Sequence, residues 1–316
     1  MTNTLFRTFR TAPCEWLKKS YKLMTGNYQQ IAVVTGANSG FGFEIAKKLS
    51  ENHIKVVLAC RSAERALQAK AQIENAVPDA DLDFIPLDLG SIKSVCEFAE
   101  IFGKKYGKIN ILVNNAGILY VPHKVTEDGF EHIFQTNYLG HFLLANLLLP
   151  FFPDEKTSKI VTQSSVMYRF GKIFFDDVNL TKKYSKWIAY SQSKFAGTVF
   201  ALELQRRLEE RGSNIQSVLA HPGISMATNI LKNKIVKTLA VKLCSFFSHS
   251  ADKGAMPAVT AALSDNIKGG DFVGLDGFLQ GKGNPVKINI LPKATDKNTA
   301  EKLWQISEKF VDKKFK

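Results

Sequence analysis

A glycine-rich segment, Thr35-Gly36-Ala37-Asn38-Ser39-Gly40-Phe41-Gly42, joins a short β-branched stretch to a stretch with helical apolar spacing. Glycines at such a turn allow positive φ and a close approach of the backbone to a ligand. The free N–H groups and the dipole at the start of the following helix favour an anion such as a pyrophosphate. A strand, a glycine-rich turn and a helix in this order are typical of a dinucleotide-binding βαβ unit. The segment therefore favours α/β folds built on a parallel sheet.

Short apolar stretches and helical patterns alternate along the rest of the chain. The predicted strands are Ile31–Thr35, Ile54–Ala59, Leu82–Leu87, Ile109–Val113, Lys159–Gln163 and Ile215–Leu219. The predicted helices are Phe43–Ser50, Ala63–Asn75, Ser91–Tyr106, Thr126–Leu149 and Trp187–Arg211. Apolar strands separated by helices predict βαβ units, whose right-handed crossovers place helices on both faces of the sheet. We expect an α/β protein with a single doubly wound parallel sheet, the Rossmann fold.

The length of the chain and the absence of a Pro-, Gly- or Ser-rich linker indicate one domain. The 316 residues are 45% apolar and 22% charged, which is close to the globular norm. We expect a basic extension over residues 1–28 and one catalytic domain over 29–316, with a substrate lid at about 224–250 and a C-terminal helix. The four cysteines form no C-x-x-C pair, so the sequence predicts neither a metal site nor a disulfide framework. This cysteine usage indicates a cytoplasmic location.

The net charge of +13 raises the question of an anionic partner. No aromatic–basic repeat or zinc-finger spacing occurs, so we expect no nucleic-acid binding. No apolar run is long enough to span a bilayer. Residues 1–28 are basic and lack the apolar core of a secretory signal, so they are interpreted as an extension, with a targeting or membrane-surface role left open.

The end of the second predicted strand bears on the choice of cofactor. An Asp or Glu at this position accepts from the ribose 2′-OH of NAD, whereas an Arg accommodates the 2′-phosphate of NADP. This chain has Cys60-Arg61 there and no carboxylate. NADP(H) is therefore favoured over NAD(H), the alternative being an Arg61 that caps the strand and faces water.

Further motifs follow the predicted strands in order. They are Asp88, Asn114-Asn115-Ala116-Gly117, Ser164-Ser165, Tyr190-x-x-x-Lys194 and His221-Pro222-Gly223. With the turn at Thr35–Gly42, this set resembles the short-chain dehydrogenase/reductase family over roughly residues 30–225. The retinol dehydrogenase-like branch is the most similar, through Leu58–Arg61, Thr136–Phe142, Gly269–Phe278 and Lys302–Glu308.

The resemblance implies a catalytic tetrad of Asn137, Ser165, Tyr190 and Lys194. Tyr190 would be the general acid/base at the substrate oxygen, and a lysine one helical turn away, together with the positive nicotinamide ring, would lower its pKa. Ser165 would donate a hydrogen bond to the reacting oxygen, with Ser164 as the alternative. Asn137 would help to hold a water that relays protons through Lys194.

The Tyr-x-x-x-Lys pattern occurs three times, so the choice of Tyr190 needs an argument. The pair beginning at Tyr120 contains Pro122, and the pair beginning at Tyr168 contains Gly171. Neither favours a continuous helix that would place both side chains on one face. Between Ser165 and Tyr190 the chain is longer than in compact family members, and we expect this insertion to form part of the substrate wall.

The resemblance also implies a set of cofactor contacts. Asp88 would lie near the adenine, with capping of the next helix as its alternative role; Asn114 and Gly117 would lie along the ribose and nicotinamide, and Pro222-Gly223 beside the carboxamide. The full expected set is Gly36, Asn38, Ser39, Gly40, Phe41, Gly42, Arg61, Asp88, Leu89, Asn114, Ala116, Gly117, Tyr190, Lys194, Pro222, Gly223 and Thr228.

Residues 228–248 follow the sixth predicted strand, where this family places its substrate lid. One side of a helix would carry Leu231, Ile235, Leu239, Leu243 and Phe246–Phe247, and the other side would carry Lys234 and Lys237. A basic amphipathic helix can lie on an anionic membrane. We therefore expect a lid, and leave peripheral membrane contact and a homodimer contact open.

Together these features predict an NADP(H)-dependent oxidoreductase that transfers hydride between the nicotinamide and a small hydrophobic alcohol, aldehyde or ketone. The alternative is a non-catalytic protein that binds NADP(H) as a sensor or scaffold.

Overall fold

The computed structural model describes residues 30–223, 250–277 and 280–312. Within them one eight-stranded sheet has the order β3-β2-β1-β4-β5-β6-β7-β8. All neighbours pair in parallel except β7 and β8, which are antiparallel. The strands are β1 Ile31–Thr35, β2 Lys55–Cys60, β3 Leu82–Pro86, β4 Ile111–Asn114, β5 Lys159–Gln163, β6 Gln216–Ala220, β7 Phe272–Leu275 and β8 Pro285–Lys287. The doubly wound Rossmann fold expected from the sequence is confirmed.

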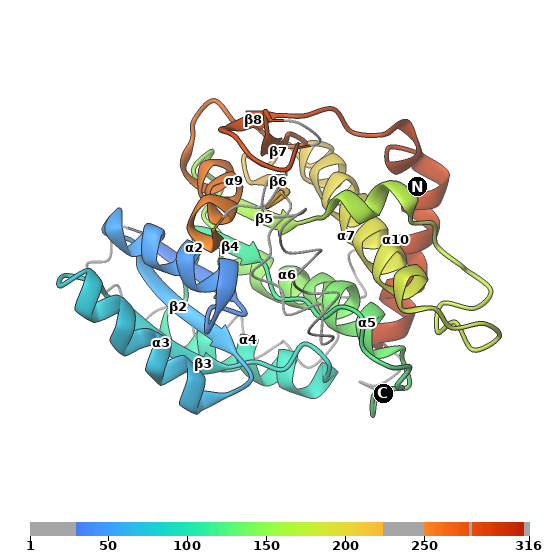
Figure 1. The fold of residues 1–316 in the computed structure, drawn as a ribbon, viewed down its shortest axis with the longest axis horizontal. Helices are drawn as coiled ribbons and strands as arrows, with labels where there is room; N and C mark the ends of the chain where they lie inside the picture. The colour runs from blue at the N-terminus through green and yellow to red at the C-terminus, as the bar shows by residue number, and fades with distance from the viewer. Residues whose placement is uncertain (1–29, 224–249, 278–279, 313–316) are drawn as a thin grey trace, which may run out of the picture.

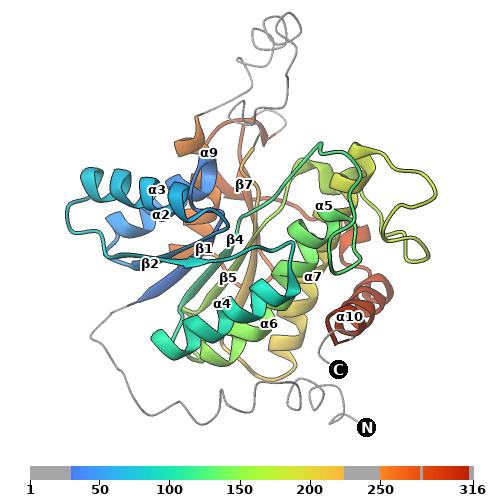
Figure 2. The same cartoon turned by 90° about the horizontal axis from the view of Figure 1, so that it is seen from below.

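Helices cover both faces of the sheet (Figures 1 and 2). They are α2 Gly40–Glu51, α3 Ala63–Ala76, α4 Ile92–Lys105, α5 His132–Phe134, α6 Gly140–Leu148, α7 Lys186–Glu209, α9 Ala251–Leu263 and α10 Lys297–Asp312. Successive strand residues alternate between two cores, because side chains of a strand point to opposite faces. Val33 and Leu112 pack with α4, α6 and α7, whereas Val34 and Val113 pack with α2, α3 and α9. Strands buried on both faces account for the nearly continuous apolar runs in the sequence.

The predicted helix Thr126–Leu149 is wrong in its first turns. Val125 and Glu131 form an antiparallel bridge around a turn that contains Gly129 at a φ of 86°. The Glu131 carboxylate then accepts the N–H groups of Ile133 and Phe134, and this cap begins α5 at His132. A π-turn, η2 at Gln135–Leu139, separates α5 from α6. The remaining predicted elements are present with ends shifted by a few residues, and β7, β8 and α9 are additions to the predicted set.

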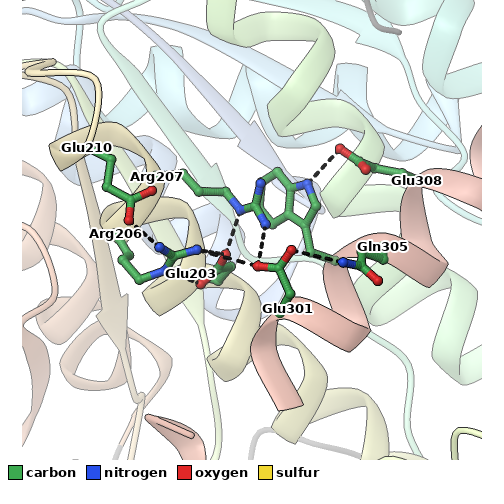
Figure 3. A network of polar contacts seen from close by, with 8 residues as sticks. Glu203, Arg206, Arg207, Glu210, Glu301, Gln305 and Glu308 are labelled. Carbon is green, nitrogen blue, oxygen red and sulfur yellow. Dashed lines mark hydrogen bonds and ion pairs between the residues drawn. The ribbon is translucent and has the colours of Figure 1, made fainter. Parts of the chain in front are cut away.

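An ion-pair network fastens α10 to α7 (Figure 3). The buried Glu203 carboxylate accepts from Arg207 Nε at 2.6 Å, and Arg207 Nη2 reaches Glu301 of α10 at 3.2 Å. The Arg207 guanidinium lies 4.3 Å from the ring centroid of Trp304, whose indole N–H donates to Glu308 at 2.7 Å. Since α7 carries Tyr190 and Lys194, this contact supports the helix that presents them.

Among the helices that the structure describes, none combines the length and the apolarity that crossing a membrane requires.

Candidate active site

A cavity of about 360 Å³ lies at the carboxyl ends of β1, β2 and β4. Ligands bind at this edge of doubly wound sheets, where the strand order reverses. Eleven of the expected cofactor residues line it: Gly36, Asn38, Ser39, Gly40, Phe41, Gly42, Arg61, Asp88, Leu89, Ala116 and Gly117. Ala59, Cys60, Leu87, Asn115, Ile118 and Thr136 also line it and were not predicted, although each lies next to a predicted site residue or ends a predicted strand.

The glycine-rich turn depends on its glycines. Gly36 and Gly40 have φ values of 67° and 58°, which L side chains rarely adopt. A Cβ at Gly42 would lie 2.3 Å from the Gly36 carbonyl oxygen, so only glycine lets α2 start so close to the turn. Ser39, at the N-cap of α2, makes no side-chain cap hydrogen bond, and the first turn of α2 contains no acidic residue. The helix N-terminus that lines the cavity therefore suits an anion.

Buried polar atoms at the same edge also fit a dinucleotide. Both polar side-chain atoms of Asn114 are buried and have no hydrogen-bond partner among the described residues, and the same holds for the Thr136 hydroxyl. Buried polar groups are otherwise nearly always paired, so the unpaired Thr136 hydroxyl, whose residue lines the cavity, indicates a ligand that pairs with it. Neighbouring Asn115 is instead used by the fold, because its Nδ2 donates to the Thr35 carbonyl at 2.8 Å.

Arg61 and Asp88 lie at the ends of β2 and β3. Arg61 is exposed and lines the cavity. The Asp88 carboxylate accepts the Gly90 N–H at 2.9 Å and so shapes its own loop. The N-cap of α4 is Ser91, so capping of that helix is not the role of Asp88.

Three of the four tetrad side chains meet at the end of β5. Ser165 hydrogen-bonds to the Tyr190 phenol. Lys194, one turn further along α7, donates to the Gln163 carbonyl at 2.9 Å and lies 5.9 Å from the centroid of the Tyr190 ring. Ser164 is turned into the core, where its hydroxyl pairs with Thr198 at 2.8 Å. The geometry therefore brings Ser165 rather than Ser164 to Tyr190.

Burial dominates the electrostatics of this pair. It raises the pKa of Tyr190, against which the hydrogen bond with Ser165 acts. It lowers the pKa of Lys194 to about 8. Without the cofactor, the residues of the chain raise the pKa of Tyr190, because burial of the phenol outweighs the hydrogen bond with Ser165. They do not by themselves produce the lowered pKa that the sequence suggested.

The fourth tetrad residue, Asn137, lies within the π-turn η2. Its Nδ2 donates to the Ile118 carbonyl at 2.9 Å and to the Ser193 hydroxyl at 3.0 Å, and its Oδ1 accepts the Ile118 N–H at 2.8 Å. A Cβ at Gly117 would lie 3.3 Å from Asn137 Oδ1 and 3.7 Å from Lys194 Nζ. Asn137 and Lys194 therefore border the same spot on the wall of the cofactor cavity. Single-turn π-bulges are frequent at functional sites.

The other expected contacts are less closely placed. Pro222 and Gly223 follow β6, with Gly223 at a φ of 75°, but neither lines the cofactor cavity. Asn114 does not line it either, although its buried side chain ends β4. Thr228 and the expected lid at 228–248 lie outside the described residues, as does the basic extension.

The two other Tyr-x-x-x-Lys tyrosines occupy different surroundings. Tyr168 is buried in the core, and its hydroxyl accepts the Leu291 N–H at 3.3 Å. Tyr120 has a φ of 55°, and its ring lies 6.1 Å from that of Tyr190 and 4.4 Å from that of Trp187. Tyr190, which lies near the start of the continuous helix α7, is the tyrosine that hydrogen-bonds to Ser165.

The insertion between Ser165 and Tyr190 borders a second cavity of about 470 Å³. Its lining runs from Lys172 to Asp177 and includes Leu180, Ile188 and Lys302 of α10, but no tetrad residue. The expectation that the insertion forms part of the substrate wall stays a prediction.

His141, which lies against the Asn137 carbonyl, is a polar residue that the sequence did not predict as part of the site. It is buried, bonds to Thr35 and to the Asn137 carbonyl, and its pKa is lowered to about 4 by burial and by the Lys194 charge. Its position four residues after Asn137, one helical turn away, was the available signal.

Among the described residues, no group of three His, Cys, Asp or Glu side chains could hold a metal ion.

Comparisons with known proteins agree with this geometry. The short chain dehydrogenase family matches residues 30–238. Retinol dehydrogenase 14 of Mus musculus is 36% identical over 295 residues, covering 88% of this chain and 85% of that protein. Retinol dehydrogenase 12 of Mus musculus is 33% identical over 314 residues, covering 97% and 95%. An uncharacterised protein from Mycobacterium paratuberculosis has a similar crystal structure, with a TM-score of 0.75 at 34% identity over 92% of this chain and 97% of that one.

The family implies a nicotinamide cofactor and oxidoreductase chemistry on CH–OH or C=O groups. The chain belongs to the short-chain dehydrogenase/reductase family of oxidoreductases, in its retinol dehydrogenase-like branch.

Proposed function

We propose that the protein transfers hydride between NADP(H) and a hydrophobic alcohol, aldehyde or ketone, with Tyr190 as the general acid/base. The observation that carries the proposal is the meeting of Ser165, Tyr190 and Lys194 at the end of β5, with Lys194 Nζ beside Gly117, which lines the cofactor cavity. When bound, the nicotinamide supplies or accepts the hydride. Residues of the chain hold the substrate oxygen and move its proton.

Tyr190 gives its phenolic proton to the substrate oxygen in reduction and takes it back in oxidation. Ser165, which already bonds to the phenol, donates to the same oxygen. Lys194 can exchange a proton near neutrality because burial lowers its pKa to about 8. Both hydrogens of the Asn137 amide are engaged with the Ile118 carbonyl and the Ser193 hydroxyl, so the side chain would hold a relay water only as an acceptor.

Replacement of Tyr190 by Phe tests the acid/base assignment. We expect kcat to fall by at least a hundredfold while the Kd for NADPH stays within about threefold, since general acid–base catalysis contributes roughly 10²–10⁴-fold. Tyr168→Phe, in another Tyr-x-x-x-Lys pair, is the matched control and should keep most of its turnover. A Tyr190→Phe enzyme with more than about a tenth of wild-type kcat would refute the assignment.

The NADP(H) preference rests on Arg61. The residue lines the cavity at the end of β2, a position without a carboxylate that could accept from a ribose 2′-OH. We expect Arg61→Ala to weaken NADPH binding by about tenfold or more and to leave NADH binding nearly unchanged. Arg65→Ala, exposed on α3 and outside the cavity lining, is the control. Equal losses for NADPH and NADH would contradict the preference.

The choice of a hydrophobic substrate is supported by the surroundings of Tyr190. Ile118, Val121 and Ile188 pack in one apolar cluster with Tyr190. The ring of Tyr120 lies between Tyr190 and Trp187 and contacts both, and the Trp187 side chain is 57% exposed. A nicotinamide-fluorescence assay over matched polar and apolar aldehydes and ketones should give higher kcat/KM for the apolar members. No turnover of any carbonyl or alcohol, with intact NADPH binding, would favour the sensor or scaffold alternative instead.

We also propose the organisation expected from the sequence: one catalytic domain over 29–316 with a lid near 224–250, preceded by a basic extension. The proposal includes a cytoplasmic location and a homodimer. It also includes peripheral membrane contact through the basic amphipathic segment 228–248. Flotation of the full chain with anionic vesicles, and its sedimentation behaviour without them, would test the membrane contact and the dimer.

A further inference from the structure

A buried hydrogen-bond chain connects the first residue of the cofactor turn to the π-turn that carries Asn137. His141 is its middle member. Its Nε2 lies 2.9 Å from Thr35 Oγ1, and its Nδ1 lies 3.1 Å from the Asn137 carbonyl oxygen. The imidazole is 3% exposed, so water does not substitute for either partner. Each ring nitrogen is thus matched to one protein atom, and the position of the proton has to follow from the partners.

The hydrogen bonds at Thr35 decide that position. Its hydroxyl oxygen accepts the N–H groups of Asn115 and Ala116, both at 2.9 Å, which uses its two lone pairs. The hydroxyl has one proton to donate, and the acceptors within reach are His141 Nε2 at 2.9 Å and the Val113 carbonyl at 3.3 Å. A proton on Nε2 would require Thr35 Oγ1 to accept a third hydrogen bond. Nε2 is therefore the acceptor, and the ring proton sits on Nδ1.

This tautomer completes the chain on the other side. A proton on Nδ1 can be donated to the Asn137 carbonyl, which has no hydrogen of its own. A doubly protonated ring would lose the bond from Thr35. The low pKa of His141, about 4, agrees with a neutral ring.

A shift of the Asn137 backbone would displace residues of the candidate site. The Asn137 side chain holds the Ile118 backbone through two hydrogen bonds and holds Ser193 on α7 through a third. Its Oδ1 and Lys194 Nζ face the same point beside Gly117. A residue that holds the Asn137 carbonyl therefore sets the wall against which Lys194 and the cofactor lie.

We propose that His141 is a positioning residue for the hydride-transfer site: a neutral imidazole protonated on Nδ1 that accepts from Thr35 and donates to the Asn137 carbonyl. It holds the π-turn in register with the cofactor turn. The kinetic part of this inference rests on the function proposed above, whereas the tautomer does not.

The tautomer is read from long-range ¹H–¹⁵N correlation spectra of the full chain at pH 7. The chain has six histidines, and the His141 signals are those missing in the His141→Gln variant. We expect a protonated Nδ1 and an unprotonated, hydrogen-bonded Nε2. A proton on Nε2, or on both nitrogens, would overturn the proposal. This result does not depend on any turnover, so failure of the proposed function would be distinguishable.

Two amide variants test the two hydrogen bonds of His141 separately. An amide nitrogen in Asn lies where His places Nδ1, and the amide of Gln reaches the place of Nε2. We expect His141→Leu to lower kcat by roughly ten- to a hundredfold, since small displacements of a catalytic group cost about that much. His141→Asn should recover part of kcat and more than His141→Gln does, with the Kd for NADPH within about threefold in each.

The concentration of folded protein in each sample is taken from NADPH titration, so that loss of folding does not count as loss of kcat. If His141→Leu does not fold, the comparison of Asn with Gln decides the question. Equal kcat values per folded molecule in the Asn and Gln variants would mean that the bond to the Asn137 carbonyl does not position the site, and would overturn the proposal.

Discussion

The buried His141 predicts a measurable loss of stability in weak acid. Burial lowers the pKa of its imidazole to about 4 in the folded protein, compared with 6.5 for an accessible imidazole. Between these two values the unfolded chain binds a proton that the folded chain does not, so stability falls as the pH falls. The whole difference corresponds to about 3 kcal/mol, because one pKa unit is worth about 1.36 kcal/mol.

Most of this loss lies in an accessible pH range. Between pH 7 and pH 5 the linkage relation gives a loss of about 2 kcal/mol from this one group. Urea unfolding followed by tryptophan fluorescence measures the free energy of unfolding at both pH values. Burial opposes the charge on Asp83, but hydrogen bonds from Lys105 and Tyr106 outweigh it and lower the pKa of its carboxyl. Protonation of Asp83 therefore destabilises the fold only at a pH at or below the usual pKa of aspartate.

The variant His141→Gln removes the titration and leaves the other groups in place. The difference in unfolding free energy between wild type and variant should therefore shrink by about 2 kcal/mol from pH 7 to pH 5. His123→Gln, at an exposed position, controls for removing an imidazole elsewhere. A wild-type-to-variant difference that stays constant within about 0.5 kcal/mol would refute the claim that His141 is buried as a neutral ring.

Three further perturbations test the packing behind the site. Trp304→Ala should cost about 3–5 kcal/mol in urea unfolding, because a buried aromatic side chain is lost, whereas Trp187→Ala, at an exposed position, should stay within about 0.5 kcal/mol. Glu203→Gln leaves the buried Arg207 with weaker compensation and should cost up to about 3–5 kcal/mol; adding Arg207→Met should recover most of that loss. Gly42→Ala drives a Cβ against the backbone of the cofactor turn and should weaken NADPH binding, measured by fluorescence titration, by tenfold or more, with a stability cost of about 1–3 kcal/mol.

The part of the site that could be predicted from the sequence is the part that strand ends define. Parallel strands carry their carboxyl ends to one edge of a sheet, so residues that follow different strands converge there. Arg61, Asp88 and Ala116 line one cavity for this reason, although they are far apart in the chain. Tyr190 and Lys194 were predictable through helix periodicity, since residues four apart share a helix face.

The unpredicted part depends on contacts that no local pattern contains. The bond between Thr35 and His141 joins residues 106 positions apart. The start of α5 was missed because the cap at Glu131 follows a turn whose residues continue the helical apolar spacing. The π-turn was missed because one additional residue per turn leaves Tyr138 and Phe142 on the buried side, as an α-helix would. β8 is three residues long and partly exposed, too short for an apolar pattern to mark it.

The C-terminal helix α10 supports the candidate site because it packs against the π-turn that carries Asn137. Asn137 points toward Lys194, while its neighbour Tyr138 points into the core, where its hydroxyl pairs with Ser307 of α10 at 2.6 Å. The Tyr138 ring also contacts Phe142 of α6 and Phe200 of α7, and both of those rings contact Trp304 of α10. Removal of α10 would leave the Tyr138 hydroxyl without this partner and the Arg207 guanidinium without Trp304 and Glu301. The elements that carry Asn137, Tyr190 and Lys194 are therefore held from behind by α10, so weakening this contact should disturb the site without altering any residue that lines it.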